Sequence, residues 1–501
     1  MYNNLKYLFI SSLVFMACSE EVTEEASIEV PLSAGTADFT KFVAVGNSLT
    51  AGFSDGALFM KGQENAYPNM MAKEFAKVGG GTFKTPFMSD NLGGFQAGGA
   101  QVAALPTRLF LNGSSPANVP GLSSTILGQS IAASGPYQNM GIPGAKSFHL
   151  GFNGYGALNP YYGRIATSAT SNVLQDAVSQ NPTFFSLWIG NNDVLAYATS
   201  GGVGVNQLGN PNPATYGNND ITDPTAFAGV YNQLINALTA NGAKGVVANI
   251  PSVTSVPYFT TVPHNPVPLD AATAGALNAG LIGPLDQILT ALGQPNRLQP
   301  LVAGNNNPLL IVDEALSPLG AQITAIAAAS GNAQLIDLAP FLGQVYGQAR
   351  HATAADLVCL PTRGVIGQPA GSPVASLNAF GVSYPLQDQH VLVPVEQQMV
   401  ATATAAFNLS IKAAADSKGL AFFDANAIMN QISTTGVVHQ GFRFTGAYVF
   451  GNSFSLDGVH LSPRANGFVA NLMLEAINSK YGSNFKPIRI TNLQALYGLI
   501  L

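Results

Sequence analysis

The sequence predicts an α/β fold, in which helices cover a parallel sheet of short buried strands and large loop insertions interrupt the core. Four short apolar runs, rich in β-branched and aromatic residues, are typical of buried strands and lie at 42–45, 183–189, 245–250 and 421–424. Longer segments with helical character lie between and after them, at 168–180, 226–241, 394–418 and 465–481. This alternation predicts βαβ units and therefore a parallel sheet.

The composition bounds the class of protein. The chain has 501 residues, enough for one large or two ordinary domains, and its 53 Gly and 31 Pro indicate many turns and loops. Only 9% of residues are charged and the net charge is −6. Because no basic stripe is available to neutralise phosphates, we expect no nucleic-acid partner.

The first residues have the pattern of an export signal. Lys6 precedes an apolar run over 7–17 that is too short to span a bilayer, and Cys18 follows at once. Residues 1–17 resemble a bacterial lipoprotein signal peptide, which implies lipidation of Cys18. The alternative is an ordinary signal peptide followed by an incidental cysteine.

An acidic segment follows Cys18. We expect residues 18–38 to form a flexible tether, and the glutamates within 20–25 resemble the export tag of surface lipoproteins in Bacteroidetes-type bacteria. The predicted location is therefore extracytoplasmic, with the protein held by a lipid anchor at a membrane. We expect this to be the outer membrane, and the acidic tag extends the expectation to exposure on the cell surface. The remaining residues, 39–501, form the predicted folded domain.

The first predicted strand, 42–45, ends at Gly46, and Ser48 follows two residues later. A hydroxyl at this point lies at the carboxyl edge of the sheet, where open α/β sheets bind ligands. Ser48 is therefore the candidate nucleophile.

The next elements are a loop-rich region and a helix. Residues 54–135 are rich in Gly, Asn, Ser and Pro, and we expect an insertion of loops with short helices. Residues 139–146 predict a turn-dense loop over the sheet edge, where Gly144 could offer an unobstructed backbone N–H to an oxyanion. The predicted helix at 168–180 ends where Asn-Pro at 181–182 breaks it.

The second strand, 183–189, is followed by Gly-Asn-Asn-Asp at 190–193. Asn192 should project from the same edge as Ser48, where its amide could donate to an oxyanion. The alternative is a turn asparagine that bonds its own backbone.

The third strand, 245–250, leads into a second insertion at about 255–393. This region contains many prolines and predicts extra strands at 309–313 and 333–337 and an Ala-rich helix near 320–329.

The last core elements are the helix 394–418, the strand 421–424 and the helix 465–481, with Asp-Gly-Val-His at 457–460 before the final helix. Serine hydrolysis needs a base and a carboxylate that orients it. His460 is the best candidate base, and Asp457 lies three residues before it. Alternatively, Asp457 caps a helix that begins near Pro463.

A rival nucleophile is Ser54, because Gly-Phe-Ser-Asp-Gly at 52–56 matches the nucleophile-elbow pattern of α/β-hydrolases. That motif requires a serine directly after a strand, and Ser54 lies eight residues beyond Gly46. We therefore favour Ser48.

Taken together, four blocks in order resemble those of the SGNH (GDSL-type) hydrolase family: 46–49, 139–144, 190–193 and 457–460. The resemblance covers the core, about 200–250 residues. It implies a catalytic triad of Ser48, His460 and Asp457, and an oxyanion hole made by the N–H groups of Ser48 and Gly144 with the Asn192 side chain. Asn47 departs from the family pattern, which usually has aspartate there.

We therefore expect a flavodoxin-like three-layer α/β/α core and a serine ester hydrolase, esterase-like or lipase-like, that needs no metal and no organic cofactor. The expected substrate is an ester, either an acyl lipid or an acetylated glycan, so a carbohydrate O-acetylesterase is one alternative. Others are a non-catalytic surface binding lipoprotein with the same fold and a long-chain lipid carrier.

Overall fold

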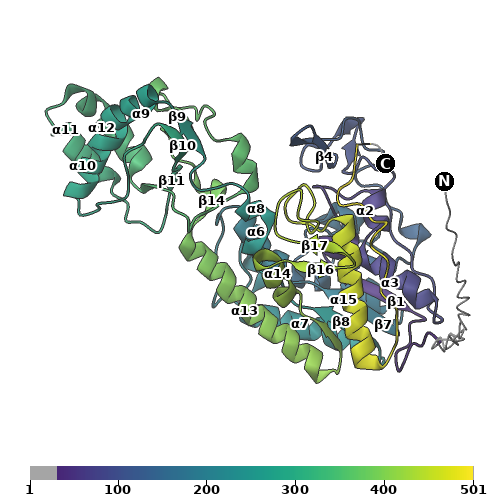
Figure 1. Cartoon of the computed structure of the whole chain (residues 1–501). Helices are drawn as coiled ribbons and strands as arrows, with labels where there is room; N and C mark the ends of the chain where they lie inside the picture. Colours follow the sequence, from purple (N-terminus) through teal and green to yellow (C-terminus); the bar gives the residue numbers. More distant parts are fainter. Residues whose placement is uncertain (1–30, 500–501) are drawn as a thin grey trace, which may run out of the picture.

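The computed structural model describes residues 31–499, and a five-stranded parallel sheet lies within the main body of the protein, at the right of Figure 1. The strand order is β15-β8-β7-β1-β6. The strands are β1 (Phe42–Gly46), β6 (Asn139–Gly141), β7 (Phe184–Trp188), β8 (Lys244–Ala248) and β15 (Ala421–Phe423). The predicted α/β class and parallel sheet are confirmed, since all four predicted core strands pair in parallel.

The register of the central strands places their carboxyl ends at one level. Gly46 at the end of β1 lies opposite Gly141 of β6 and Trp188 of β7. The segments that follow β1 and β7 therefore begin side by side, and these segments carry Ser48 and Asn192.

Helices cover both faces of this sheet because side chains alternate along each strand. Phe42 and Ala44 of β1 face a core built with α3 (Tyr67–Ala76) and α15 (Pro463–Tyr481). Val43 and Val45 face the other core, which includes α5 (Val173–Val178), α7 (Pro224–Thr239) and α13 (Pro394–Ser417). The strands are thus apolar on both sides, as buried parallel strands are.

Two elements near the sheet differ from prediction. Residues 139–141 were expected to be loop, but they form the edge strand β6, which is too short for a recognisable pattern. The helix expected at 168–180 begins only at Val173, because the side chain of Asn172 caps it by accepting a hydrogen bond from the Gln175 N–H.

The second insertion forms a lobe with a hydrophobic core of its own, at the upper left of Figure 1. Its helices are α9 (Ala271–Leu277), α10 (Gly283–Ala291), α11 (Gly320–Ala328) and α12 (Ala333–Tyr346). The predicted helix near 320–329 and strand at 309–313 are confirmed by α11 and β11 (Leu310–Val312). The strand predicted at 333–337 is wrong, because Asn332 caps a helix there by accepting from the N–H groups of Gln334 and Leu335.

Six two-stranded sheets decorate the core and the lobe. Their strands, other than β11, are β2 (Gln96–Ala97), β3 (Ala100–Gln101), β4 (Leu109–Asn112), β5 (Ser115–Asn118), β9 (Val267–Leu269), β10 (Gly304–Asn307), β12 (Ala349–His351), β13 (Leu357–Val358), β14 (Val391–Leu392), β16 (Val437–His439) and β17 (Phe442–Phe444). The remaining α-helices are α1 (Ser48–Ala51), α2 (Met60–Glu64), α4 (Pro160–Gly163), α6 (Asn192–Thr199), α8 (Pro257–Thr260) and α14 (Ala425–Thr434).

The start of the described chain packs on the body. The N–H of Ser33 donates to Asn484 and that of Thr36 donates to the Tyr481 carbonyl at the end of α15. The end of the segment predicted as a tether, 18–38, is therefore bonded to the body. The predicted signal peptide 1–17 and Cys18 lie outside the described residues. Within 31–499, no helix is both long enough and apolar enough to cross a bilayer.

Candidate active site

Ser48 is held at a sharp turn between β1 and the short helix α1. The side chain of Asn47 caps α1 by accepting a hydrogen bond from the Leu49 N–H at 3.1 Å. Gly46 allows this turn, because a Cβ at that position would lie 2.2 Å from Thr50 Oγ1 and 2.5 Å from the Trp188 carbonyl oxygen. Ser48 is thus placed at the carboxyl edge of the sheet with its side chain only slightly exposed.

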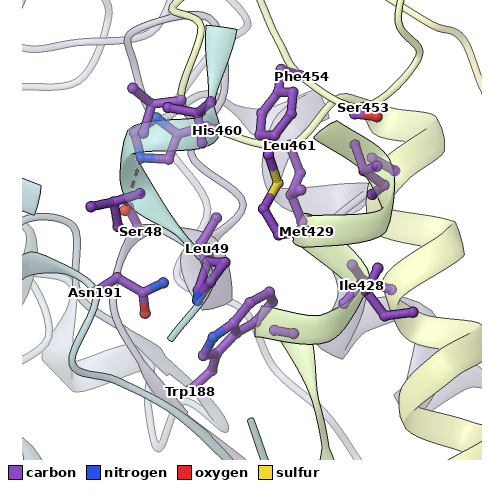
Figure 2. Close-up of a pocket in the computed structure, with 18 of the residues that line it drawn as sticks. Ser48, Leu49, Trp188, Asn191, Ile428, Met429, Ser453, Phe454, His460 and Leu461 are labelled. Carbon is purple, nitrogen blue, oxygen red and sulfur yellow. Dashed lines mark hydrogen bonds between the residues drawn. The ribbon is translucent and has the colours of Figure 1, made fainter. Parts of the chain in front are cut away.

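The structure brings Ser48, His460 and Asp457 into one hydrogen-bonded chain. Ser48 Oγ lies 2.9 Å from His460 Nε2, as the dashed line in Figure 2 shows, and His460 Nδ1 lies 2.8 Å from Asp457 Oδ2. Since a carboxylate faces Nδ1, the neutral imidazole carries its proton there and leaves Nε2 free to accept the serine proton. This is the arrangement that nucleophilic activation of a serine requires.

Asp457 is fixed as an anion by a ring of donors. Its Oδ1 accepts from the N–H groups of Val459 and His460 at 2.9 and 2.8 Å, and its Oδ2 accepts from the Gly56 N–H at 2.9 Å. Burial alone would raise the pKa of Asp457, but the charge and hydrogen bonds of His460 outweigh burial and hold this pKa well below its usual range. The carboxylate therefore stays charged at neutral pH.

Residues 53–56 complete the support of this loop, a role that no local pattern in the sequence indicates. The ring of Phe53 packs on that of His460, with centroids 4.6 Å apart. Asp55 is fully buried, and its Oδ1 accepts from the Leu456 N–H at 2.9 Å. Burial raises the pKa of Asp55 to about 7. Because these partners are about 400 positions apart, spacing in the sequence could not have shown them.

Three groups are candidates to bind an oxyanion, as the sequence predicted. Within the described chain, the N–H groups of Ser48 and Gly144 donate to no acceptor, but Gly144 is not among the residues that line the cavity beside Ser48. Asn192 lies in the wall of the same cavity as Ser48, and its amide donates to the carbonyl of Ala145 at 2.9 Å. That bond joins the Gly144 turn to the start of α6.

Asp193, which was not predicted as a functional residue, anchors the same two segments. Its carboxylate is completely buried and accepts from the N–H and hydroxyl of Ser147, at 2.8 and 2.7 Å, and from the Thr222 hydroxyl at 2.9 Å. Asp193 therefore fixes the distance between the Gly144 turn and Asn192. The one sequence feature that could have indicated this role is the position of Asp193 directly after Asn192 in the third motif block, 190–193.

The rival serine is engaged elsewhere. Ser54 is buried, and its hydroxyl donates to the Leu461 carbonyl at 3.2 Å. No imidazole in the described residues is hydrogen-bonded to it. The geometry therefore favours Ser48 over Ser54 as nucleophile.

One group of carboxylates in the described residues is close enough to share a cation. Oxygen atoms of Glu314, Asp388 and Glu396 all lie within 4.8 Å of one another. None of these residues lines the cavity beside Ser48. The three carboxylates therefore lie outside the Ser48 constellation.

Comparisons with known proteins add no relative to this picture: no family model, no curated protein and no solved structure matches the chain.

Proposed function

We propose that this protein is a serine ester hydrolase. The observation that carries the proposal is the chain of contacts from Ser48 Oγ through His460 to Asp457, with distances of 2.9 and 2.8 Å. Such a chain gives a hydroxyl a base and gives the base an orienting carboxylate. The contact between Ser48 and His460 is not a local pairing, because these two residues are 412 positions apart.

The proposed reaction has two stages. His460 Nε2 takes the proton of Ser48 as the hydroxyl oxygen attacks the ester carbonyl, and the resulting oxyanion is stabilised by the N–H groups of Ser48 and Gly144 and by the Asn192 amide. The imidazolium, held by Asp457, then protonates the leaving alcohol. Water, deprotonated by His460, hydrolyses the acyl-enzyme and restores Ser48.

The order of the core strands supports a relationship to the SGNH (GDSL-type) hydrolases. In chain order the five strands are arranged 2-1-3-4-5, which is the flavodoxin-like order, and helices cover both faces of the sheet. The four motif blocks lie in the predicted order along this core. We therefore propose a flavodoxin-like three-layer α/β/α hydrolase of that family.

Asn47, the departure from the family pattern, is compatible with this proposal. Its Oδ1 makes the capping bond to Leu49 that an aspartate could also make, and its Nδ2 donates to Asn191 Oδ1 at 3.3 Å. The turn that presents Ser48 is therefore held without a charge at position 47.

A fluorophosphonate probe tests the proposal, because it labels only an activated serine. We expect the wild type and Ser54→Ala to be labelled and to hydrolyse p-nitrophenyl acetate. Ser48→Ala should lose labelling and at least about 10⁴-fold in turnover. An unlabelled wild type that nevertheless binds glycan or lipid would instead support the surface binding lipoprotein or the lipid carrier.

The proposal includes export and anchoring through Cys18, which places the enzyme outside the cytoplasm and on a membrane. Metabolic labelling with a fatty-acid analogue tests this part: we expect label on the wild type and none on Cys18→Ala. Equal labelling of both proteins would contradict the lipid anchor.

A further inference from the structure

The catalytic serine opens onto a cavity whose empty space, counted together with the open solvent at its mouth, is about 830 Å³. Twenty-four residues line it, and eighteen of these are apolar. A single acetyl group contacts only the lining next to the nucleophile, so the rest of the apolar lining is available to another part of the substrate.

Polar groups lie almost entirely at the catalytic end of the cavity. Five of the six polar lining residues belong to the segments that carry the catalytic groups: Asn47, Ser48, Asn191, Asn192 and His460. The sixth is Ser453, whose hydroxyl donates to the Gly451 carbonyl at 3.3 Å. Among residues 31–499, no Asp, Glu, Lys or Arg lines the cavity. A sugar ring placed there would lose its hydrogen bonds to water, which is costly for buried hydroxyls.

The apolar part extends from Ser48 into the space between α14 and α15. In Figure 2, Ser48 and His460 lie on one side, Leu461 and Met429 lie in the middle, and Ile428 of α14 lies on the far side. Phe468 of α15 adds to the same lining. These apolar residues could therefore surround an extended part of a ligand that begins at Ser48 and continues toward α14 and α15.

We infer that this cavity holds the acyl chain of the substrate, so that the enzyme acts on esters of long-chain fatty acids and not on acetylated glycans. The inference rests on the proposed function, because the chain must be joined to the carbonyl that Ser48 attacks. Each methylene that leaves water for the cavity should strengthen binding of the acyl chain about fourfold, since burying one CH₂ is favourable by about 0.8 kcal/mol.

The test is a series of p-nitrophenyl esters from acetate to palmitate, assayed with acetylated xylan in parallel. For the wild type we expect kcat/KM to rise by about fourfold per methylene until the cavity is full. In Ile428→Trp, the indole should occupy the far end of the cavity and lower the ratio of kcat/KM for long esters to that for acetate by about tenfold or more. Met429→Phe provides a second reduction of the cavity if Ile428→Trp does not fold.

Ile336→Trp is the matched control, because Ile336 is 42% exposed on α12 and does not line the cavity. For Ile336→Trp, the ratio of kcat/KM for long esters to that for acetate should equal the wild-type ratio. Acetate hydrolysis with no rise along the series, or a preference for acetylated xylan, would overturn the acyl-chain inference and leave the proposed hydrolase standing. Absence of both ester turnover and fluorophosphonate labelling would overturn the hydrolase and the inference with it.

Discussion

Asn192 is the residue on which the proposed stabilisation of the oxyanion can be tested separately from the triad. One of its amide hydrogens is engaged by the Ala145 carbonyl, and the amide carries a second. We expect Asn192→Ala to lower kcat by about 10²–10³-fold, with little change in KM, because the donor acts on charge that develops only in the transition state. Steady-state kinetics with a short-chain ester measure both constants.

Asn232→Ala is the control for this substitution, since Asn232 is exposed on α7 and its loss should leave kcat unchanged. A loss in Asn192→Ala that appears in KM alone would contradict the oxyanion role and assign the amide to ground-state binding.

Asn47 allows a second test at the same scale. Asn47→Asp keeps the oxygen that accepts from the Leu49 N–H but loses the donor to Asn191, whereas Asn47→Ala loses both contacts. We expect Asn47→Ala to lower the free energy of unfolding by about 0.5–2 kcal/mol and Asn47→Asp to lower it by less. Urea unfolding of the two variants and the wild type gives the comparison.

Activity of the same variants completes this test. If the cap is what matters, kcat/KM of Asn47→Asp stays within about tenfold of the wild type. An Asn47→Asp protein that folds as stably as the wild type but is as inactive as Ser48→Ala would show that the amide itself is needed.

Among the elements, the junction of β1 and α1 requires a residue without a side chain at position 46. The backbone of Gly46 lies so close to the Thr50 side chain and the Trp188 carbonyl that a Cβ has no room. We expect Gly46→Ala to destabilise the protein by about 1–3 kcal/mol, the usual cost of forcing a methyl group into a packed region. It should also lower kcat, because relief of the clash moves Ser48. Thermal unfolding measures the effect on stability, and the rate of labelling by the fluorophosphonate probe measures the effect on Ser48.

Gly229→Ala is the same substitution in a permissive place, the exposed side of α7, where a Cβ would meet nothing within 4 Å. Since alanine is the better helix former, this variant should be more stable by up to about 1 kcal/mol. Destabilisation of both variants to the same extent would refute the steric explanation at Gly46.

The elements also show what sequence patterns can and cannot predict. The core strands and most of the helices were predicted because each has a local apolar period. The prediction of a strand at 333–337 was wrong because an asparagine caps a helix that begins there. Strand β6 was not predicted because it is only three residues long. The triad was predicted from short motifs, whereas the contacts of Asp55 and Gly56 with the Asp457 loop depend on tertiary structure alone.

At the scale of the whole molecule, the sheet-centred core and the lobe have separate hydrophobic cores, and an acidic group lies where they meet. Glu314 follows β11 of the lobe, Asp388 precedes β14, and Glu396 is in the first turn of α13. Glu396 also contacts the core after α6, because a Cβ at Gly202 would lie 2.0 Å from its Oε1. The charge state of this group should therefore affect how firmly the two parts pack.

Burial, together with repulsion among neighbouring carboxylates, raises the pKa of Asp388 to about 7 and that of Glu396 to about 8. Arg350 is paired with Asp313 and Asp356 at 2.6 Å, and among the described residues it forms no ion pair with Asp388 or Glu396. Between the ordinary carboxyl pKa near 4.5 and pH 8, the folded state holds protons that the unfolded state has released. Stability must therefore fall as pH rises through this window and stay reduced above it.

Glu396→Gln should remove a large part of that fall, because glutamine keeps the acceptor for the Val393 N–H and carries no charge. We compare the free energy of unfolding of the variant with that of the wild type. This difference should favour the variant by at least about 1 kcal/mol more at pH 9 than at pH 5, since one pKa unit corresponds to about 1.4 kcal/mol. Urea unfolding at both pH values measures this difference.

Glu475→Gln, at an exposed position of α15, is the matched control and should show no such gain. If Glu396→Gln also gains nothing, the pKa of Glu396 is not raised in the folded protein, and the coupling between lobe and core does not depend on the charge of this residue.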